Sequence, residues 1–452
     1  MKEDSAIEPS AERIADERGT DKNPLSDIST VTHDDGEKDI PTEKEGGLAA
    51  ILTVIGSGLV YFASFGFMNS YGYFQDYYQT DYLANYSSST IAFIGTLQIS
   101  LMYFVGPVVG AAFDRWGLKW LYPIGLVGCC GSMLGLSFSQ RGQIYQQFLS
   151  QGILFGLFVS FGVQPALAVM GQHFKKHRAM AMGLAAGGSS IGGVCLPIMF
   201  ARMVPRIGFA WTIRLATLIF FCCFMGAMLL SRTKVTPSGS NVVVRKPLRL
   251  GTLLDFAGYK DPRYLVLAIG CFTANLGLYV PYYYIESYTL LRYPDSSIHS
   301  YLLPLINGLS FFGRIMGGFV ADRIGRLNLL YPMTFVSGVF SLAMWLPANN
   351  VATIIAFVCL YGFSSGIFIS VMPAVVAQIS PDDKIGARIG ALFTLAGVAT
   401  LIGTPIAGSL VDRDAVDGYR SLILFGGLTN AAGGALFLLA RFLCDRDLRT
   451  KW

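Results

Sequence analysis

The sequence predicts an all-α membrane protein with twelve transmembrane helices arranged as two bundles of six. Of its 452 residues, 53% are hydrophobic and only 14% are charged, whereas an ordinary soluble domain is about a quarter charged. The apolar residues form runs of about 20 or more, the length of a membrane-spanning helix. In addition, motifs in the first half of the chain recur in the second half, which predicts that the bundles arose by duplication.

Twelve apolar segments follow one another along the chain. We expect each to be a helix, because a backbone in lipid must satisfy its hydrogen bonds internally, and the short alternating segments of a membrane β-barrel are not visible. The expected spans are 48–74, 89–113, 120–139, 144–170, 180–201, 208–230, 264–285, 300–321, 328–347, 351–377, 389–411 and 421–443.

The soluble segments divide the chain further. Residues 1–45 hold 14 acidic residues and no apolar run, which predicts a disordered acidic tail that is either inert or regulatory. Residues 231–263 are rich in basic residues, Gly and Pro and are expected to be a linker. The predicted order is a tail (1–45), a first bundle (46–230), the linker (231–263), a second bundle (264–443) and a short tail (444–452).

Lysine and arginine residues predict the orientation. If the N-terminus is cytoplasmic, 20 of them lie in the short loops and tail on that side and six lie on the opposite side. The excess predicts that both termini are cytoplasmic. The plasma membrane is the default location, because no organelle address is visible.

One charged turn occurs twice at equivalent places. "GAAFDRWG" begins at Gly110 and "GFVADRIG" begins at Gly318, 208 positions later. "QPALAV" (164–169) and "MPAVVA" (372–377) share this offset. Arg178 corresponds more loosely to Arg388, at an offset of 210.

The duplicated turn is expected to be a gate. The two glycines would allow close helix approach. The Asp-Arg pairs could hold the cytoplasmic face closed by interacting with helix ends or with basic residues of neighbouring loops. The alternative is that these pairs only mark the membrane boundary. The proposed gating residues are Gly110, Asp114, Arg115, Gly318, Asp322 and Arg323.

These motifs resemble the signature of the major facilitator superfamily, and the chain looks most like its monocarboxylate porter group, in particular the fungal branch. The stretches that carry this second resemblance are "EGGLAA", "FGFMNSYGYFQDYY", "HFKKHRAMAMGLAAGGSSIGG", "GLYVPYYYI" and "NGLSFFGRIMGGFVADRIGR". The resemblance implies a secondary transporter for a small organic solute, with its site between the bundles near the middle of the bilayer.

Two positions depart from the acid-transporting members of that group. A lysine near the end of span one is replaced by Asn69, and an aspartate one turn before the span-eight arginine is replaced by Ser310. The sequence therefore predicts transport that depends weakly on a proton gradient, unless Asp76 or Glu286 serves as the protonatable group.

Polar residues within the spans are the candidates for substrate binding. Arg314 lies about 12 Å inside the cytoplasmic border at 1.5 Å per residue, and an arginine at that depth usually faces a cavity or a partner. Amides could line the same cavity or only hydrogen-bond between helices, and the tyrosines around Pro281 could stack on substrate or belong to an aromatic belt. The predicted substrate-binding residues are Arg314, Asn69, Asn307, Tyr279, Tyr283 and Gln164.

The sequence gives no sign of catalysis. Motifs for ATP binding, zinc proteases and serine hydrolases are missing, and the cysteines and histidines predict neither a metal site nor a cofactor. Asn85 begins a sequon in a short loop, where glycosylation is not expected.

The leading function is therefore a secondary active or facilitative transporter of a small organic solute that works by alternating access. The alternatives are an efflux transporter for a secondary metabolite and a nutrient sensor without transport. The expected partners are the solute and the lipid bilayer, without nucleic acid, and the expected state is a monomer.

Overall fold

The computed structural model describes residues 47–174, 178–233, 254–381, 384–411, 416–447 and 450–452. The predicted acidic tail and most of the predicted linker lie outside these residues. The body from Glu45 to Trp452 is one compact unit, so the predicted bounds of the two bundles remain a prediction.

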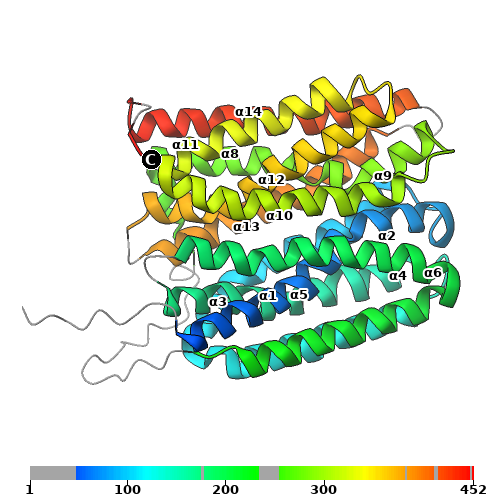
Figure 1. The fold of residues 1–452 in the computed structure, drawn as a ribbon, viewed down its shortest axis with the longest axis horizontal. Helices are drawn as coiled ribbons and strands as arrows, with labels where there is room; N and C mark the ends of the chain where they lie inside the picture. Colours follow the sequence, from blue (N-terminus) through cyan, green and yellow to red (C-terminus); the bar gives the residue numbers. More distant parts are fainter. Residues whose placement is uncertain (1–46, 175–177, 234–253, 382–383, 412–415, 448–449) are drawn as a thin grey trace, which may run out of the picture. The chain divides into compact units, whose positions relative to one another are not determined.

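The described residues form helices joined by short loops (Figure 1). The first half consists of α1 (Leu48–Asn69), α2 (Tyr71–Tyr77), η1 (Tyr78–Tyr82), α3 (Ser88–Ser137), α4 (Ile144–Gln147), η2 (Phe148–Leu154), α5 (Phe155–His173) and α6 (Arg178–Leu230). The second half consists of η3 (Phe256–Lys260), α8 (Pro262–Leu278), α9 (Val280–Arg292), α10 (His299–Ile324), α11 (Arg326–Phe340), η4 (Ser341–Trp345), α12 (Val351–Ile379), α13 (Ile385–Ser409), η6 (Val416–Tyr419) and α14 (Arg420–Cys444).

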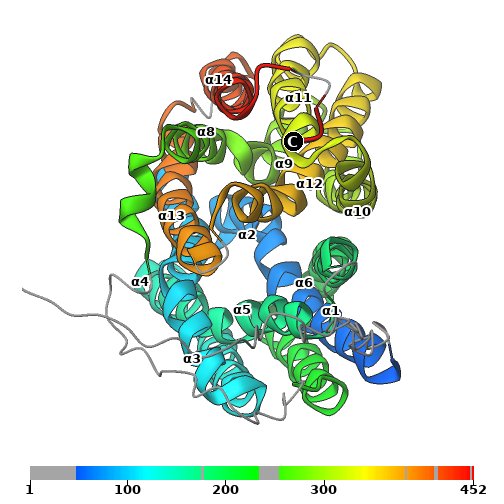
Figure 2. The same ribbon diagram turned by 90° about the vertical axis from the view of Figure 1, so that its left-hand side faces the viewer.

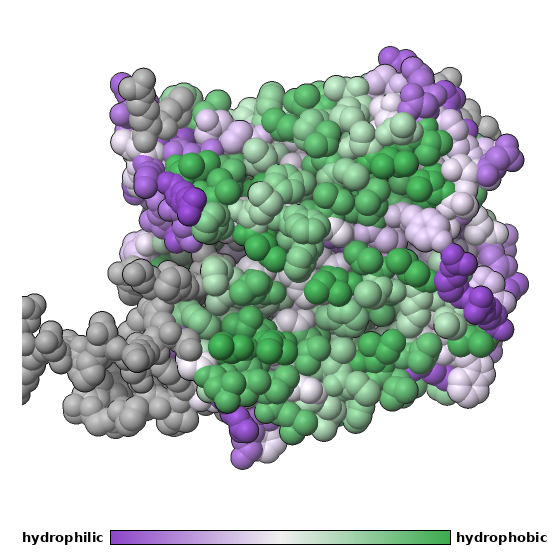
Figure 3. Space-filling model, in the orientation of Figure 1, coloured by the Kyte–Doolittle hydropathy of each residue, from purple (hydrophilic) through white to green (hydrophobic). Residues whose placement is uncertain are grey.

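The helices are long and apolar enough to cross a membrane twelve times. Eleven stretches qualify among the described residues, and one of them, Met180–Leu230, has 51 residues. At 1.5 Å per residue it would be about 76 Å long if straight, far more than a bilayer needs. It bends at Gly208, whose φ of 80° is not helical, so it contains two spans. Figure 3 shows the result as an apolar band between polar ends. The predicted fold class is confirmed.

Several helix ends differ from the prediction. The first span continues to Tyr82 and the seventh to Arg292, beyond the predicted ends at 74 and 285. Aromatic and polar residues extend both helices past the apolar runs that marked them, and side chains such as Tyr78 and Thr289 are buried inside the protein. The predicted gap at 202–207 is helical because the turn occurs only at Gly208.

Two ends of the helical body are distinguished below. The Leu48 end holds the starts of α1, α8 and α13 and the end of α14. The Tyr82 end holds the ends of η1 and α9 and the start of α10. The sequence predicts that the Leu48 end is cytoplasmic.

The duplicated charged turns form matching bends at the Leu48 end. Gly117, the last residue of the first copy, has a φ of 61°, and Gly325, the last residue of the second copy, has a φ of 104°. Glycine adopts such angles without the steric cost that a Cβ imposes. Each motif therefore ends one span and turns the chain into the next.

The two halves meet mainly along three pairs of helices. α3 lies beside α13, and α6 lies beside α10, whereas α2 contacts α9. Figure 2, which looks onto the Leu48 end, shows α5, α6, α10, α12 and α13 standing around a centre in which α2 is visible.

Candidate functional site

A cavity of about 270 Å³ lies between the two halves. Its lining extends from Asp322 and Arg326 at the Leu48 end to Tyr61 in α1 and Leu278 at the end of α8. No described residue of α2 or α9 contributes to the lining. The cavity therefore reaches from one end of the helical body to its middle.

The lining is largely apolar and aromatic, with a few polar groups. The aromatic members are Tyr61, Phe65, Tyr103, Phe368 and Phe393, and the methionines are Met102, Met182 and Met372. The rings of Tyr103 and Phe393, from opposite halves, stack with centroids 5.2 Å apart. Such a surface suits a flat apolar solute whose orientation is fixed by a small number of polar contacts.

Arg314 is the buried cation of this cavity, as the sequence predicted. Its side chain is 3% exposed. Its Nε donates to Ser310 Oγ at 3.2 Å, and its Nη1 donates to Ala186 O at 3.2 Å and to Ser189 Oγ. These last two bonds join α10 to α6 across the two halves.

The guanidinium has no ion-pair partner among the described residues, and its Nη2 forms no hydrogen bond with them. Beyond its hydrogen-bond partners, the tyrosines Tyr61, Tyr103, Tyr279 and Tyr282 lie within electrostatic reach of the guanidinium, and they are neutral when protonated. A buried arginine without a carboxylate is costly. An anionic or strongly polar ligand atom would supply the missing acceptor.

The other predicted substrate-binding residues divide into two groups. Gln164 in α5 lines the cavity, and so does a second amide, Asn275 in α8. Asn69 and Asn307 do not line it. Asn307 Nδ2 donates to Leu303 O one turn back in its own helix, and its Oδ1 is buried without a partner.

The tyrosine cluster lies deeper than predicted. Tyr279, Tyr282, Tyr283 and Tyr284 are all buried, with at most 6% of each exposed. They surround the break between α8 and α9 in the middle of the seventh span rather than its outer end, so they are not a lipid-facing aromatic belt. Tyr279 and Tyr283 lie outside the cavity lining.

Sequence reasoning missed the aromatic and sulfur-containing lining. A tyrosine in the middle of an apolar run, such as Tyr61 or Tyr103, was an available signal because its hydroxyl group seeks a polar partner. Phe368 and Met372 gave no such signal, because an apolar side chain in an apolar run can face either lipid or a cavity. Cys271 also lines the cavity, which provides a native position for chemical labelling.

The second copy of the predicted gate forms local contacts. Asp322 Oδ1 lies 3.6 Å from Arg326 Nη2, and the Arg323 guanidinium lies over the Phe319 ring at 4.0 Å. These contacts stay within α10 and the start of α11, so the gating role of this turn remains a prediction. The side chains of Asp114 and Arg115 lie outside the described residues.

One expected contact of the gate is not found. A Cβ placed on Gly110 would have no heavy atom within 4 Å, so this glycine does not serve a close helix approach in this conformation. Gly318 lines the cavity. Asn85 is exposed in the loop between η1 and α3.

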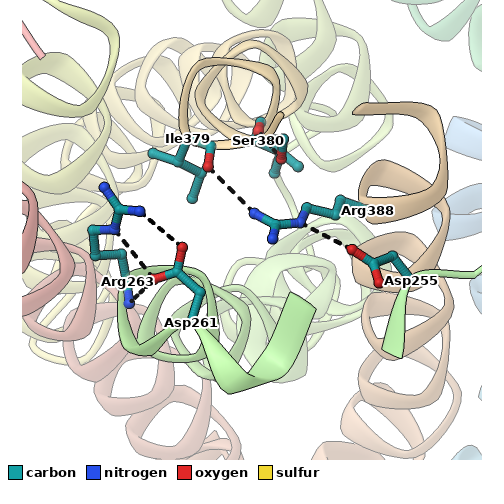
Figure 4. A network of polar contacts seen from close by, with 7 residues as sticks. Asp255, Asp261, Arg263, Ile379, Ser380 and Arg388 are labelled. Carbon is teal, nitrogen blue, oxygen red and sulfur yellow. Dashed lines mark hydrogen bonds and ion pairs between the residues drawn. The ribbon is translucent and has the colours of Figure 1, made fainter. Parts of the chain in front are cut away.

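A polar network at the Leu48 end fixes the start of α13 (Figure 4). Arg388 Nε donates to Asp255 Oδ2 at 3.2 Å, and Arg388 Nη1 donates to Ile379 O at 3.3 Å. Asp261 caps α8 through the Arg263 amide, and the Arg263 guanidinium beside it holds the pKa of the Asp261 carboxyl below its usual value. The segment before α8 is therefore attached to α12 and α13.

The opposite end is closed by contacts between α2 and α9. The rings of Tyr71 and Tyr283 lie 4.9 Å apart, and Ser287 Oγ donates to Asp76 Oδ1 at 3.0 Å. A Cβ on Gly72 would lie 2.3 Å from Tyr282 O, so only glycine allows this approach. A cavity open at one end and sealed at the other is one state of an alternating-access cycle.

Comparison with known proteins identifies one family that matches most of the chain and relatives that are similar over most of their length. The family described as Major Facilitator Superfamily matches residues 50–391 and 309–450. "MFS-type transporter 1" of Ophiocordyceps sp. is 38% identical over 398 residues, which cover 88% of this chain and 86% of that protein. The "Fujikurins efflux protein" of Gibberella fujikuroi is 35% identical over 429 residues, which cover 94% and 90% respectively.

A third relative is the "Agnestins efflux protein AgnL12" of Paecilomyces divaricatus, which is 35% identical over 415 residues, or 91% of this chain and 92% of that protein. None of these three is named as a monocarboxylate porter. The predicted resemblance is therefore confirmed for the superfamily only, and two of these three relatives are named as efflux proteins.

Proposed function

The chain belongs to the major facilitator superfamily, and from this premise we propose that it is a secondary transporter that exports an organic metabolite bearing an acidic or strongly polar group. The observation that carries the proposal is Arg314, which is buried in the wall of the cavity without a carboxylate partner among the described residues. Export is favoured over uptake because two related proteins are named for the efflux of fujikurins and agnestins.

The chemistry of the lining suggests how the solute is held. The guanidinium of Arg314 offers Nη2 to a carboxylate or enolate oxygen, and a charged bond of this kind is stronger than a neutral one. The amides of Gln164 and Asn275 fix the polar part, while the aromatic rings of the lining contact the apolar part. Because position 310 holds a serine instead of an aspartate, no carboxylate neutralises the guanidinium, and its Nη2 is available for substrate. The departures from the acid-transporting monocarboxylate porters thus fit a larger solute than lactate.

Alternating access then proceeds by closing the two ends of the helical body in turn. The α2–α9 contact seals the Tyr82 end while the solute enters from the Leu48 end. In the second state, the charged turns at Asp114 and Asp322 would close the Leu48 end. We place the protein as a monomer in the plasma membrane with cytoplasmic termini, so that the Tyr82 end faces outward and release there is export.

Release from intact cells tests this function. Cells that express the protein are loaded with 2-naphthoate, a flat aromatic carboxylate, and the rate of its release is compared with that from cells expressing Arg314→Gln at the same surface level. We expect faster release with the unmodified protein. Equal rates would contradict export of an aromatic anion.

A further inference from the structure

Two acidic residues occupy equivalent positions in the two halves. Asp76 in α2 and Glu286 in α9 are 210 positions apart, the same offset that relates Arg178 to Arg388. Each follows a break in its span, at Ser70 in the first half and at Tyr279 in the second. The duplication therefore brings a carboxyl group from each half to the contact that closes the Tyr82 end.

The surroundings of the pair are tightly packed. Asp76 accepts a hydrogen bond from Ser287 Oγ at 3.0 Å, and Ser287 is the residue next to Glu286. Glu286 is only 6% exposed. Thr289, one turn further along the same face of α9, is fully buried and its Oγ1 has no partner. This face of α9 therefore carries a buried hydroxyl group without a partner one turn from Glu286.

The pair has little positive charge around it. Neither carboxylate forms an ion pair with any residue that the structure describes, and the two are within electrostatic reach of each other. The other titratable groups that face them are Tyr73 on α2 and His299 at the start of α10. Asp81 at the same end differs, because it is 41% exposed and lies 2.9 Å from Arg141 Nη2.

We propose that Asp76 and Glu286 form a proton-binding site, and that closure of the α2–α9 contact requires at least one proton on this pair. Glu286 is buried and Asp76 is half-buried, and two like charges brought together in such surroundings cannot both remain ionised without an energetic cost. The step is reversible proton binding to a carboxylate oxygen, with the proton drawn from the solution at the Tyr82 end while the contact is open.

The direction of the pH effect follows from this linkage. Acid at the Tyr82 end protonates the pair and favours the closed contact, while loss of the proton restores the repulsion and favours opening. The ratio of closed to open molecules then falls as pH rises, by about tenfold per pH unit for one linked proton. This inference concerns the conformational equilibrium, so it can be tested without any substrate.

A distance measurement tests whether protonation closes the α2–α9 contact. Nitroxide labels are placed on cysteines introduced at Thr80 and Leu291, both of which are exposed, in a chain whose eight native cysteines are replaced. The distance distribution is recorded in lipid nanodiscs from about pH 5 to about pH 9 by electron-electron double resonance. We expect the short distance to dominate in acid and to give way to a longer one as pH rises.

Neutral variants identify the group responsible. Asp76→Asn with Glu286→Gln mimics the protonated pair, so the short distance should persist at every pH. Glu286→Gln alone should also remain closed, because a single carboxylate has no partner to repel. Asp81→Asn and His299→Gln are the matched controls and should keep the response of the unmodified chain.

Three results would overturn the proposal. They are a distance that does not change with pH in the unmodified chain, a full pH response that survives when both carboxyl groups are neutralised, and a response that disappears with His299→Gln. The last result would assign proton binding to the imidazole instead.

Discussion

Replacement of Arg314 by glutamine removes the buried cation of the cavity and keeps a hydrogen-bonding amide. The guanidinium donates to Ser310, Ala186 and Ser189, which leaves Nη2 for a ligand oxygen. One hydrogen bond from a charged group contributes about 1.5–3 kcal/mol. Its loss should raise the Kd for 2-naphthoate roughly 10- to 140-fold. Arg314→Lys keeps the charge but loses the planar fork, so it should bind more weakly than the unmodified protein and retain some transport.

The assay is ligand-dependent thermal stabilisation of the purified protein, which gives Kd from the dependence of Tm on ligand concentration. The hydrocarbon 2-methylnaphthalene, which has no hydrogen-bond acceptor, serves as a second ligand and should bind both proteins with the same Kd. Arg214→Gln is the matched control. Arg214 lies at the Tyr82 end over the rings of Phe138 and Trp211 and does not line the cavity.

An unchanged Kd for 2-naphthoate in Arg314→Gln would refute the reasoning. In that case Arg314 would act in folding, through its bonds from α10 to α6. Poor accumulation of the variant in the membrane, with normal binding by the protein that survives, would point to the same conclusion.

Three further predictions concern the two ends of the helical body. Asp322→Asn should slow transport and increase labelling of the cavity cysteine from the Leu48 end, because the charged turn can no longer hold that end closed. Gly72→Ala should favour opening of the Tyr82 end, measured by distances between labels, since its Cβ would overlap Tyr282 O, whereas Gly131→Ala has free space and should change nothing. Arg388→Gln should lower Tm by an amount equivalent to less than about 3 kcal/mol, because it removes the closer and more buried partner of the Asp255 carboxylate and leaves only Lys384 Nζ at 3.9 Å; an unchanged Tm would contradict this role.

The course of the chain through the membrane was predictable from composition and duplication. Apolar runs mark the spans because lipid accepts only helices with satisfied backbones, and the repeated "DR" turns relate the two halves. The bends at Gly117 and Gly325 coincide with the last glycine of each repeat. The extensions to Tyr82 and Arg292 could not be predicted from hydropathy, because polar residues there are covered by the other half of the protein rather than by lipid.

The lining of the cavity was only partly predictable. Arg314 and Gln164 were identified because charge or an amide inside an apolar run needs an explanation. The rotation of each helix about its axis was not predictable, since an apolar side chain is equally suited to lipid, to a neighbouring helix or to the cavity. For this reason Asn307 and Tyr283 were grouped with the substrate site, whereas Tyr103 and Phe393 were not.

Counterflow in reconstituted vesicles tests the central claim, transport by alternating access, most directly. Vesicles that contain the purified protein are loaded with unlabelled 2-naphthoate and diluted into a trace of the labelled compound. A carrier that exposes its site to one side at a time predicts a transient accumulation of label inside above the equilibrium level, which neither a channel nor a sensor produces. We expect this overshoot with the unmodified protein and no overshoot with Arg314→Gln. Equilibration without an overshoot, or no protein-dependent uptake, would contradict it.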